Sequence, residues 1–290
     1  MELQNQKPTQ KLPHFVTDDG RTHLRTPLMR ESLVSSALQA RLAENPNDEV
    51  NLLPWAKLIN IGGCILDRGA TALLPLLEAV VAARDAGHPI IVSVGGGARM
   101  RHTLEIGMDL GLPIGGLAQI VGAVEEQNSH MVHAILSKQG GVSMCREHFA
   151  ELPKYLLTGM IPIVISVPPY HFWEPPPREG NIPENGSDLG AFMTSEVLGV
   201  SQMLFIKDQE GQFTEDPERV ANAKLLEQCH VADLVNKPAE DLLLERSVLH
   251  ALNRARNVRS IRVINGLNAN NLKRALDGET IGTHIEQDPR

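Results

Sequence analysis

The sequence predicts a three-layer α/β/α sandwich with a mainly parallel central sheet. From Leu52 onward, short apolar runs alternate with helix-length segments, a pattern typical of parallel strands joined by helical crossovers. Three turns that carry glycine follow apolar runs, at 62–63, 95–97 and 211. Open α/β sheets bind ligands at such strand ends. The core is expected to be aliphatic, because 42% of the residues are hydrophobic but only 3% are aromatic.

The 290 residues are expected to form a polar N-terminal arm, residues 1–51, and one domain, residues 52–290. Within the arm, Glu31–Ala43 has apolar residues at helix spacing, but a segment this polar has too little core to fold independently. We interpret it as a surface arm or an arm that contacts a partner.

Each element of the domain is bounded by a recognisable local signal. The first half is expected to contain a strand at Trp55–Ile61 before Gly62, a helix within Arg68–Asp85, a buried strand at Pro89–Val94, a helix at Arg99–Met108 before Gly111, and a long helix at Leu117–Gln139 closed by Gly140.

The second half follows the same alternation. It is expected to contain a strand at Ile161–Val167, a proline-rich loop at Pro168–Ser187, a helix at Asp188–Leu198, a strand at Gln202–Lys207, a charged amphipathic helix at Glu240–Arg256, a strand at Ser260–Ile264, a helix at Asn270–Leu276 that stops before Gly278, and a last strand at Ile281–Ile285.

Composition excludes several classes of function. A formal net charge of −8 argues against a general nucleic-acid binder, although a local basic pocket for an anion remains compatible with it. Three widely spaced cysteines indicate neither a disulfide framework nor a cysteine-based zinc site, and they favour a reducing cytoplasm. The N-terminus has no apolar signal core, and the longest apolar run, near Ile161–Val167, is too short to span a membrane.

The glycine turns are the first candidate binding elements. Glycine lets backbone N–H groups approach a phosphate closely, and Gly95-Gly96-Gly97 is followed by Arg99 and Arg101 at a helix start. Backbone donors, a helix N-terminus and guanidinium groups would then meet at one anion. The alternative is an ordinary turn with solvated arginines.

Asp188 and four histidines are further candidates. Asp188 stands at a helix start, where capping the helix is the commonest role, although it could also orient a metal-bound phosphate. His130 and His133 lie three residues apart on the long helix, and His148 and His171 lie elsewhere in the chain. Imidazole binds metals and donates to oxyanions, but surface histidines are the simpler interpretation.

In order along the chain, these loops resemble the amino acid kinase superfamily, which includes uridylate, acetylglutamate and aspartate kinases. The resemblance rests on the Gly-Gly turn at 62–63, the glycine loop at 95–97, Asp188 in an Asp-x-Gly-Ala context, and Asp-x-Glu-Gly-x-Phe-Thr-x-Asp-Pro at 208–217. It implies a nucleotide site with catalytic positions at Asn60 and Asp188. The cofactor-binding residues that it implies are Gly62, Gly63, Gly95, Gly96, Gly97, Arg99, Lys207, Asp208, Glu210, Gly211, Phe213, Asp216 and Pro217.

Within that superfamily, residues 52–285 more closely resemble the molybdenum storage subgroup. The segments that carry this resemblance include Asp67-Arg68-Gly69, Gln127-Asn128, Pro168-Pro169-Tyr170-His171 and Asn265-Gly266-Leu267. It implies a cage-like hexamer, formed with itself or with a paralogous subunit, that binds ATP with Mg²⁺ and stores molybdate or tungstate as polynuclear oxo clusters. His171 matches a cluster-binding loop of the subgroup, and we add His130, His133 and His148 as candidate contacts.

The chain departs from the superfamily at Asn60, where members usually carry a lysine that neutralises the transferring phosphate. Loss of that cation removes electrostatic stabilisation and argues against phosphoryl transfer more than against nucleotide or oxoanion binding. Lys57 is expected on the opposite strand face, and Lys207 is expected out of line with the missing group. Three hypotheses remain: a storage protein, an active nucleoside monophosphate or amino acid kinase, and a non-catalytic paralogous subunit.

Overall fold

The computed structural model describes residues 14–16, 22–24, 51–166 and 186–289. The chain separates into two units, residues 1–50 and residues 51–290. In the first unit, the described residues form an antiparallel pair of strands, β1 (His14–Val16) and β2 (Thr22–Leu24). The predicted helix at Glu31–Ala43 lies outside the described residues, as does most of the proline-rich loop.

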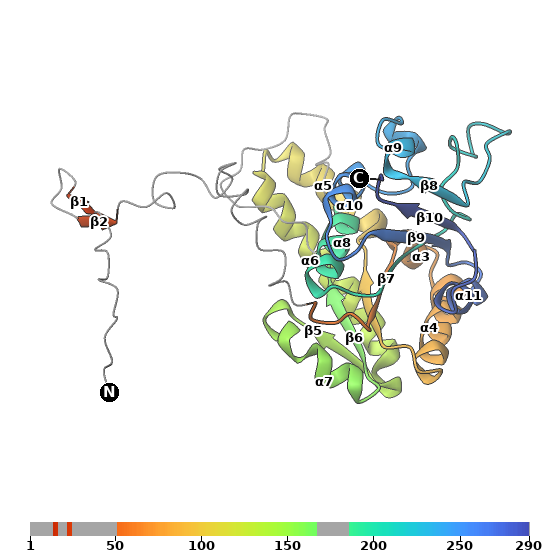
Figure 1. Ribbon diagram of the computed structural model, residues 1–290, viewed down its shortest axis with the longest axis horizontal. Coiled ribbons are helices and arrows are strands. Elements are labelled where there is room, and N and C mark those ends of the chain that lie inside the picture. The colour runs from red at the N-terminus through yellow and green to blue at the C-terminus, as the bar shows by residue number, and fades with distance from the viewer. Residues whose placement is uncertain (1–13, 17–21, 25–50, 167–185, 290) are drawn as a thin grey trace, which may run out of the picture. The chain divides into compact units, whose positions relative to one another are not determined.

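The described part of the second unit is built on an eight-stranded sheet in the order β5-β6-β4-β3-β7-β9-β10-β8 (Figure 1). Its strands are β3 (Lys57–Ile61), β4 (Ile90–Val94), β5 (Gly141–Met144), β6 (Ile161–Ile165), β7 (Gln202–Lys207), β8 (Gln228–His230), β9 (Ser260–Asn265) and β10 (Thr283–Glu286). All neighbouring strands pair in parallel except β9 and β10, which are antiparallel. The predicted mainly parallel sheet is therefore confirmed.

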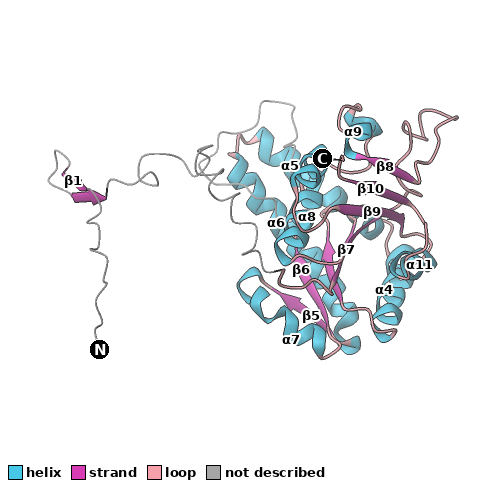
Figure 2. Cartoon of the chain, in the orientation of Figure 1, coloured by secondary structure: helices cyan, strands magenta, loops and turns pink. Residues whose placement is uncertain are grey.

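Helices cover both faces of this sheet and complete the predicted three layers (Figure 2). The α-helices are α3 (Gly63–Asp67), α4 (Ala70–Asp85), α5 (Gly97–Asp109), α6 (Ile114–Leu136), α7 (Leu152–Leu157), α8 (Ser187–Leu198), α9 (Val231–Leu234), α10 (Arg246–Arg254) and α11 (Asn270–Leu276), and the 3-10 helices are η2 (Ser137–Gln139), η3 (Arg146–Glu151) and η4 (Ala239–Asp241). Among the described helices, none is both long enough and apolar enough to cross a membrane.

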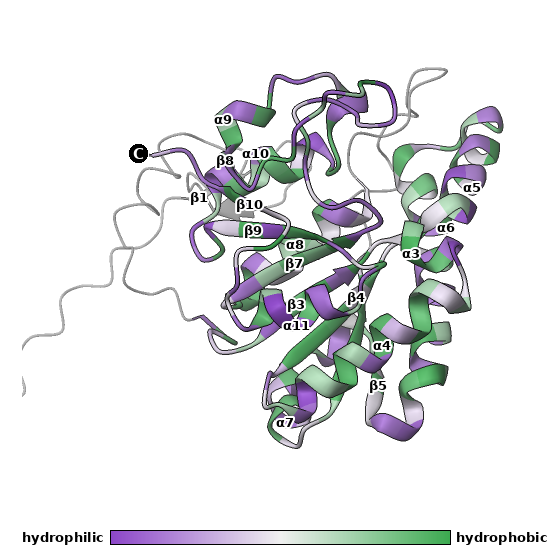
Figure 3. Cartoon of the chain, turned by 90° about the vertical axis from the view of Figure 1, so that its right-hand side faces the viewer, coloured by the Kyte–Doolittle hydropathy of each residue, from purple (hydrophilic) through white to green (hydrophobic). Residues whose placement is uncertain are grey.

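Side-chain alternation along the strands creates two aliphatic cores. In β3, Ile59 and Ile61 belong to the core under α4, α6 and α11, whereas Leu58 belongs to the core under α7, α8 and α10. The central strands are largely green in Figure 3, as expected for a parallel sheet that is buried on both faces. Lys57 donates to the carbonyl of Leu276 on the α11 side, which confirms that it lies on the opposite face from Asn60.

Several predicted element bounds were wrong for identifiable reasons. The expected helix at Glu240–Arg256 is interrupted, because the described chain forms η4 and then begins α10 only at Arg246. Between them, the N–H of Leu243 donates to Oε1 of Gln212 over 2.9 Å, so this backbone bonds to another segment rather than to itself. The short elements β5, β8, α3, α7 and α9 were missed because each spans only three to six residues.

Candidate functional site

The first two glycine turns meet at the carboxyl ends of the central strands. The N–H of Gly62 donates to the carbonyl of Ile206 and that of Gly95 to the carbonyl of Ile61, each over 2.9 Å. A Cβ added at Gly63 would lie only 2.0 Å from the backbone nitrogen of Gly97, so glycine is required for this close approach. The structure thus brings together two loops that the sequence places more than thirty residues apart.

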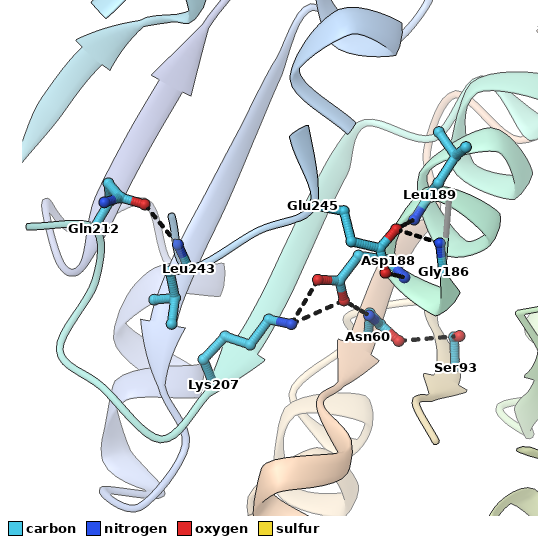
Figure 4. A network of polar contacts seen from close by, with 9 residues as sticks. All are labelled: Asn60, Ser93, Gly186, Asp188, Leu189, Lys207, Gln212, Leu243 and Glu245. Carbon is cyan, nitrogen blue, oxygen red and sulfur yellow. Dashed lines mark hydrogen bonds and ion pairs between the residues drawn. The ribbon is translucent and has the colours of Figure 1, made fainter. Parts of the chain in front are cut away.

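Asn60, Asp188 and Lys207 form a polar cluster next to these turns (Figure 4). Nδ2 of Asn60 donates to Oδ1 of Asp188 over 3.0 Å, and Nζ of Lys207 donates to Oδ1 and Oδ2 over 2.9 and 2.6 Å. The side chains of Asp188 and Lys207 are only 8% and 13% exposed, so this ion pair is well shielded from solvent. Burial opposes the Lys207 charge, but the adjacent Asp188 carboxylate outweighs burial and raises the pKa of Lys207.

This cluster corrects the expected position of Lys207. Its ammonium lies beside position 60, because Lys207 and Asn60 donate to the same oxygen of Asp188. The strand register explains the arrangement: Asn60 pairs with Phe205, and Lys207 follows two residues later on the same face of the neighbouring strand. A cation is therefore present where the superfamily lysine is missing, but it is supplied by β7 rather than by β3.

The cluster continues into the buried centre of the sheet. Oγ of Ser93 donates to Oδ1 of Asn60 over 3.2 Å and also contacts Oγ of Ser166. Asn60, Ser93 and Ser166 are all 1% exposed or less. The amide of Asn60 is therefore held at both ends, which fixes its orientation toward Asp188.

The predicted capping role of Asp188 is wrong. Helix α8 has Gly186 at its N-cap and Asp188 within its first turn, and the Asp188 carboxylate bonds to Asn60 and Lys207 instead. The cap is supplied by Glu245, which lies immediately before α10 and accepts the N–H groups of Gly186, Asp188 and Leu189. Burial and then the nearby Asp188 carboxylate raise the pKa of Glu245 to about 7, although the three N–H groups oppose this shift.

The arginines after the second glycine loop are engaged within the protein. The guanidinium of Arg99 donates to Oδ1 of Asn128, whose own Nδ2 donates to the carbonyls of Gly95 and Gly96 over 2.7 and 3.1 Å. Arg101 lies 4.0 Å from a carboxylate oxygen of Asp67. Arg99 is therefore part of the support of the glycine loop, a role that the sequence did not indicate.

The loop at 208–217 bonds to residues outside the polar cluster. Asp208 accepts from Arg68 over 2.8 Å, and Glu210 accepts from Asn265 over 2.8 Å. Gly211 has φ +153°, and a Cβ added there would lie 2.5 Å from Oγ1 of Thr283. A cavity of about 90 Å³ lies beside this loop, and the residues that line it are Gln209, Gln212, Phe213, Glu215, Asp216, Pro217, Glu218, Glu240, Asp241, Leu242 and Leu243.

The candidate metal-binding histidines do not form a cluster within the described residues. His130 is exposed on α6 near Glu126, and His133 lies on the same helix. His148 is exposed in η3, where its Nδ1 lies 2.9 Å from Sγ of Cys145. His171 lies outside the described residues. Nowhere in the described part of the chain do three histidine, cysteine or acidic side chains come together to hold a metal ion.

Comparisons with known proteins show which family the chain belongs to. Residues 56–265 match the amino acid kinase family. The chain is 38% identical over 266 residues to molybdenum storage protein subunit beta of Azotobacter vinelandii, which covers 89% of this chain and 95% of that protein. It is 22% identical to a uridylate kinase of Methanobrevibacter smithii over 68% of this chain and 84% of that protein.

Solved structures show the same fold. The crystal structure of uridylate kinase from Archaeoglobus fulgidus superposes with a TM-score of 0.63 at 16% identity and covers 79% of this chain and 99% of the other. The chain therefore belongs to the amino acid kinase family, and the resemblance to its molybdenum storage subgroup is confirmed.

Proposed function

From this family membership we propose that the chain is a nucleotide-binding storage subunit that holds molybdate or tungstate as polynuclear oxo clusters in an oligomeric cage. The observation that carries the proposal is the 38% identity to a molybdenum storage protein subunit over 95% of that subunit's length. The relative's name identifies it as one subunit of a storage protein, which supports assembly with itself or with a paralogous chain. We propose that this assembly is a hexamer, as the subgroup resemblance implies. We place the assembly in the cytoplasm.

The residues of the polar cluster are compatible with ATP and Mg²⁺. Lys207 supplies a cation, Asp188 supplies carboxylate oxygens, and the glycine turns allow close backbone approach to phosphate. Mg²⁺ is typically bound by one or two carboxylates together with substrate phosphates, so this donor set fits it. When bound, Mg²⁺ would neutralise phosphate charge, while Lys207 and the glycine amides would orient the phosphates.

Phosphoryl transfer to a nucleoside monophosphate is a second candidate function, and the position of Lys207 favours it. A cation beside Asp188 could replace part of the stabilisation that Asn60 cannot provide. However, Lys207 is already paired with Asp188 through both carboxylate oxygens, so its charge is largely neutralised before any nucleotide arrives. We therefore place storage ahead of catalysis.

Retained metal tests the proposal directly. The full chain is produced in cells supplied with molybdate or tungstate, purified with ATP and Mg²⁺ present, and analysed for metal per chain by mass spectrometry. Storage predicts metal well above one atom per chain, because a polynuclear cluster holds many metal atoms. The same metal analysis is repeated on protein produced together with a paralogous subunit, and metal retained only in that preparation indicates a chain that only shapes a shell. Absence of retained metal in both preparations contradicts storage.

A kinase assay separates the second candidate. Purified protein is incubated with ATP, Mg²⁺ and uridylate, and nucleoside diphosphate formation is measured. Turnover at rates typical of enzymes, above about 1 per second, would favour a kinase over a storage protein. The matched control is a Lys207→Met variant, which should lose any such turnover if Lys207 supplies the cation.

A further inference from the structure

A cavity of about 170 Å³ lies at the amino ends of β7 and β9, at the opposite edge of the sheet from the polar cluster. Gln202, which lines this cavity, is the first residue of β7, whereas Lys207 of the polar cluster is the last residue of the same strand. Leu204 and Ala275 contribute apolar surface to the lining. The cavity is therefore separate from the site described above.

The strand register places the polar side chains of this cavity next to one another. Arg262 on β9 pairs with Leu204 on β7 and with His284 on β10. Gln202 lies two residues before Leu204 and therefore on the same face of the sheet. This is the face that α11 covers, and Figure 1 shows α11 beside β9. Three neighbouring strands thus supply one arginine, one glutamine and one histidine to one cavity.

The guanidinium of Arg262 has no ion-pair partner among the described residues. The side chain is half-buried, and one of its N–H groups donates to the carbonyl of Glu279. Burial lowers the pKa of Arg262, and no acidic side chain opposes this effect. A guanidinium carries five N–H donors in a planar fork that matches a carboxylate. The bond to Glu279 therefore holds the fork in place and leaves donors for a ligand.

Two buried acceptors in the same cavity also lack a hydrogen bond within the described part of the chain. They are Oε1 of Gln202 and Nδ1 of His284. Nε2 of His284 lies 3.0 Å from Oε1 of Glu286, so in the neutral ring the proton belongs on Nε2 and Nδ1 keeps its lone pair. A buried acceptor without a donor is unfavourable, so a ligand that donates to these two atoms would be stabilised there.

A neighbouring cation shows that polar groups at this edge of the sheet are not generally left unpaired. Lys57 on β3 pairs with Gln202 in the strand register. Its Nζ donates to the carbonyl of Leu276 over 2.9 Å and lies 3.0 Å from Nδ1 of His88. The protein therefore satisfies Lys57 by itself, whereas the groups that line the cavity need a partner from outside the described residues.

We propose that this cavity binds a small monocarboxylate that carries hydroxyl groups, with its carboxylate on Arg262 and its hydroxyls donating to Oε1 of Gln202 and Nδ1 of His284. A single guanidinium suits one negative charge better than the several charges of a nucleotide. The volume corresponds to about five or six water molecules, which restricts the ligand to a few carbon atoms. Hydroxyls also donate without placing a second cation beside Arg262, as an ammonium group would. The inference goes beyond the proposed function and does not depend on it.

Ordered water is the alternative occupant, because water molecules can donate to both acceptors. Water carries no charge, however, and leaves Arg262 without a counterion. Probes that differ from one another by a single group distinguish the two occupants. Glycerate has the carboxylate and two hydroxyls, lactate lacks one hydroxyl, propionate lacks both, glyceramide lacks the charge, and serine has an ammonium group in place of one hydroxyl.

Binding of each probe to the full chain is measured by ligand-detected NMR titration at constant ionic strength and about pH 8, where a free imidazole is neutral. We expect glycerate to bind at least about tenfold more tightly than propionate, glyceramide or serine, with lactate between glycerate and propionate. Each weaker probe either leaves a buried group without a partner or adds a cation beside Arg262.

Two substitutions assign the contacts. Arg262→Gln should weaken glycerate binding at least about tenfold, and Gln202→Leu should reduce the difference between glycerate and lactate to less than about threefold, because one acceptor is then absent. Arg259→Gln is the matched control, since it removes the same charge from an exposed residue of the segment that leads into β9. Its glycerate affinity should equal that of the wild type.

Equal wild-type affinity for glycerate and propionate, or for glycerate and glyceramide, would overturn the inference, as would tighter binding of serine or no binding of glycerate at about 10 mM. An equal loss in Arg259→Gln and Arg262→Gln would attribute the effect to net charge and would also contradict it. If Arg262→Gln fails to fold, the comparison of glycerate with glyceramide on the wild type still tests the role of the charge. The metal-retention experiment reports on storage alone, so either proposal can fail without the other.

Discussion

The ammonium of Lys207 lies 2.6 Å from Oδ2 of Asp188 and 2.9 Å from Oδ1, the same oxygen that accepts from Asn60. The lysine ends a strand and the aspartate lies in the first turn of a helix, so the ion pair connects the sheet to the layer above it. Removing one member of a buried ion pair leaves the other charge without compensation. This relationship leads to the first prediction.

Lys207→Met should lower the free energy of unfolding by about 3 kcal/mol, because Asp188 would remain buried with only Asn60 as a side-chain donor. Asp188→Asn combined with Lys207→Met should recover part of that loss, since no charge is then buried. Urea unfolding of the wild type and both variants measures this. A loss below about 1 kcal/mol in Lys207→Met would show that the pair contributes no more than a surface salt bridge.

Asn60→Lys alone should not restore ATP hydrolysis, because the new ammonium would compete with Lys207 for Asp188 while Glu245 still occupies the α8 N–H groups. Asn60→Lys combined with Glu245→Gln should raise the rate at least about tenfold over the wild type, since both a cation and free backbone donors then face the phosphate. Steady-state phosphate release measures the rates. A gain of that size in the single Asn60→Lys variant would show that Glu245 does not obstruct the site.

Stability should depend on pH through Glu245. Its pKa is raised to about 7 in the folded protein from an ordinary value of 4.5, so the folded state holds this proton more tightly than the unfolded state. The resulting stabilisation is fully present at pH values below the ordinary value and is lost as the pH rises through about 7. Allowing for partial exposure of the side chain, we expect a difference of about 2 kcal/mol between acidic and mildly alkaline solution.

Comparison with Glu245→Gln isolates this contribution, because the variant has no titrating group at that position. Chemical unfolding of both proteins at several pH values should give a wild-type stability that falls relative to the variant as the pH increases. A constant difference between the two proteins across this range would contradict a raised pKa at Glu245.

Gly63→Ala should disrupt the contact between the two glycine turns. The added Cβ would lie 2.0 Å from the backbone nitrogen of Gly97, and backbone on both sides leaves no flexible side chain to move. We expect a loss of about 3 kcal/mol or more in the free energy of unfolding. Gly116→Ala in α6 is the control: its Cβ would meet nothing nearer than 3.5 Å, so stability should be unchanged or rise by about 0.5–1 kcal/mol. Equal effects of the two substitutions in thermal unfolding would argue against the close contact.

The local sequence predicted most of the sheet correctly, and the physical reason is that its signals are local. Gln202–Lys207 and Asn270–Leu276 were predicted with the bounds that the structure shows, because an apolar run or a helix-spaced segment ends at a polar or glycine residue. The interrupted segment before Arg246 was predicted as one helix because its break is caused by Gln212, about thirty residues away.

The candidate site was only partly predictable for the same reason. Residue type and position identified Asp188 and the glycine turns, and the family resemblance added Asn60 and Lys207, but neighbouring residues could not show which of them share a partner. Glu245 gave no signal in the sequence, since a glutamate before a helix is common on protein surfaces. The one hint in the sequence is that Gly186, at the N-cap of α8, has no side chain to cap the helix, so an acidic residue from elsewhere in the chain could be expected to accept the free N–H groups.

Strand and helix positions, the aliphatic core and the glycine-bearing strand ends followed from the order of residues, because each depends on contacts among near neighbours. The strand order brings Lys207 beside Asn60, and the packing of the domain sets Glu245 against α8. Asp188 bonds to Asn60, which lies 128 residues earlier in the chain, and to Glu245, which lies 57 residues later. Only packing of the whole domain creates the low-dielectric environment that raises the pKa of Glu245 and strengthens the Asp188–Lys207 pair. The charge state of the site is therefore a property of the folded domain and not of any segment within it.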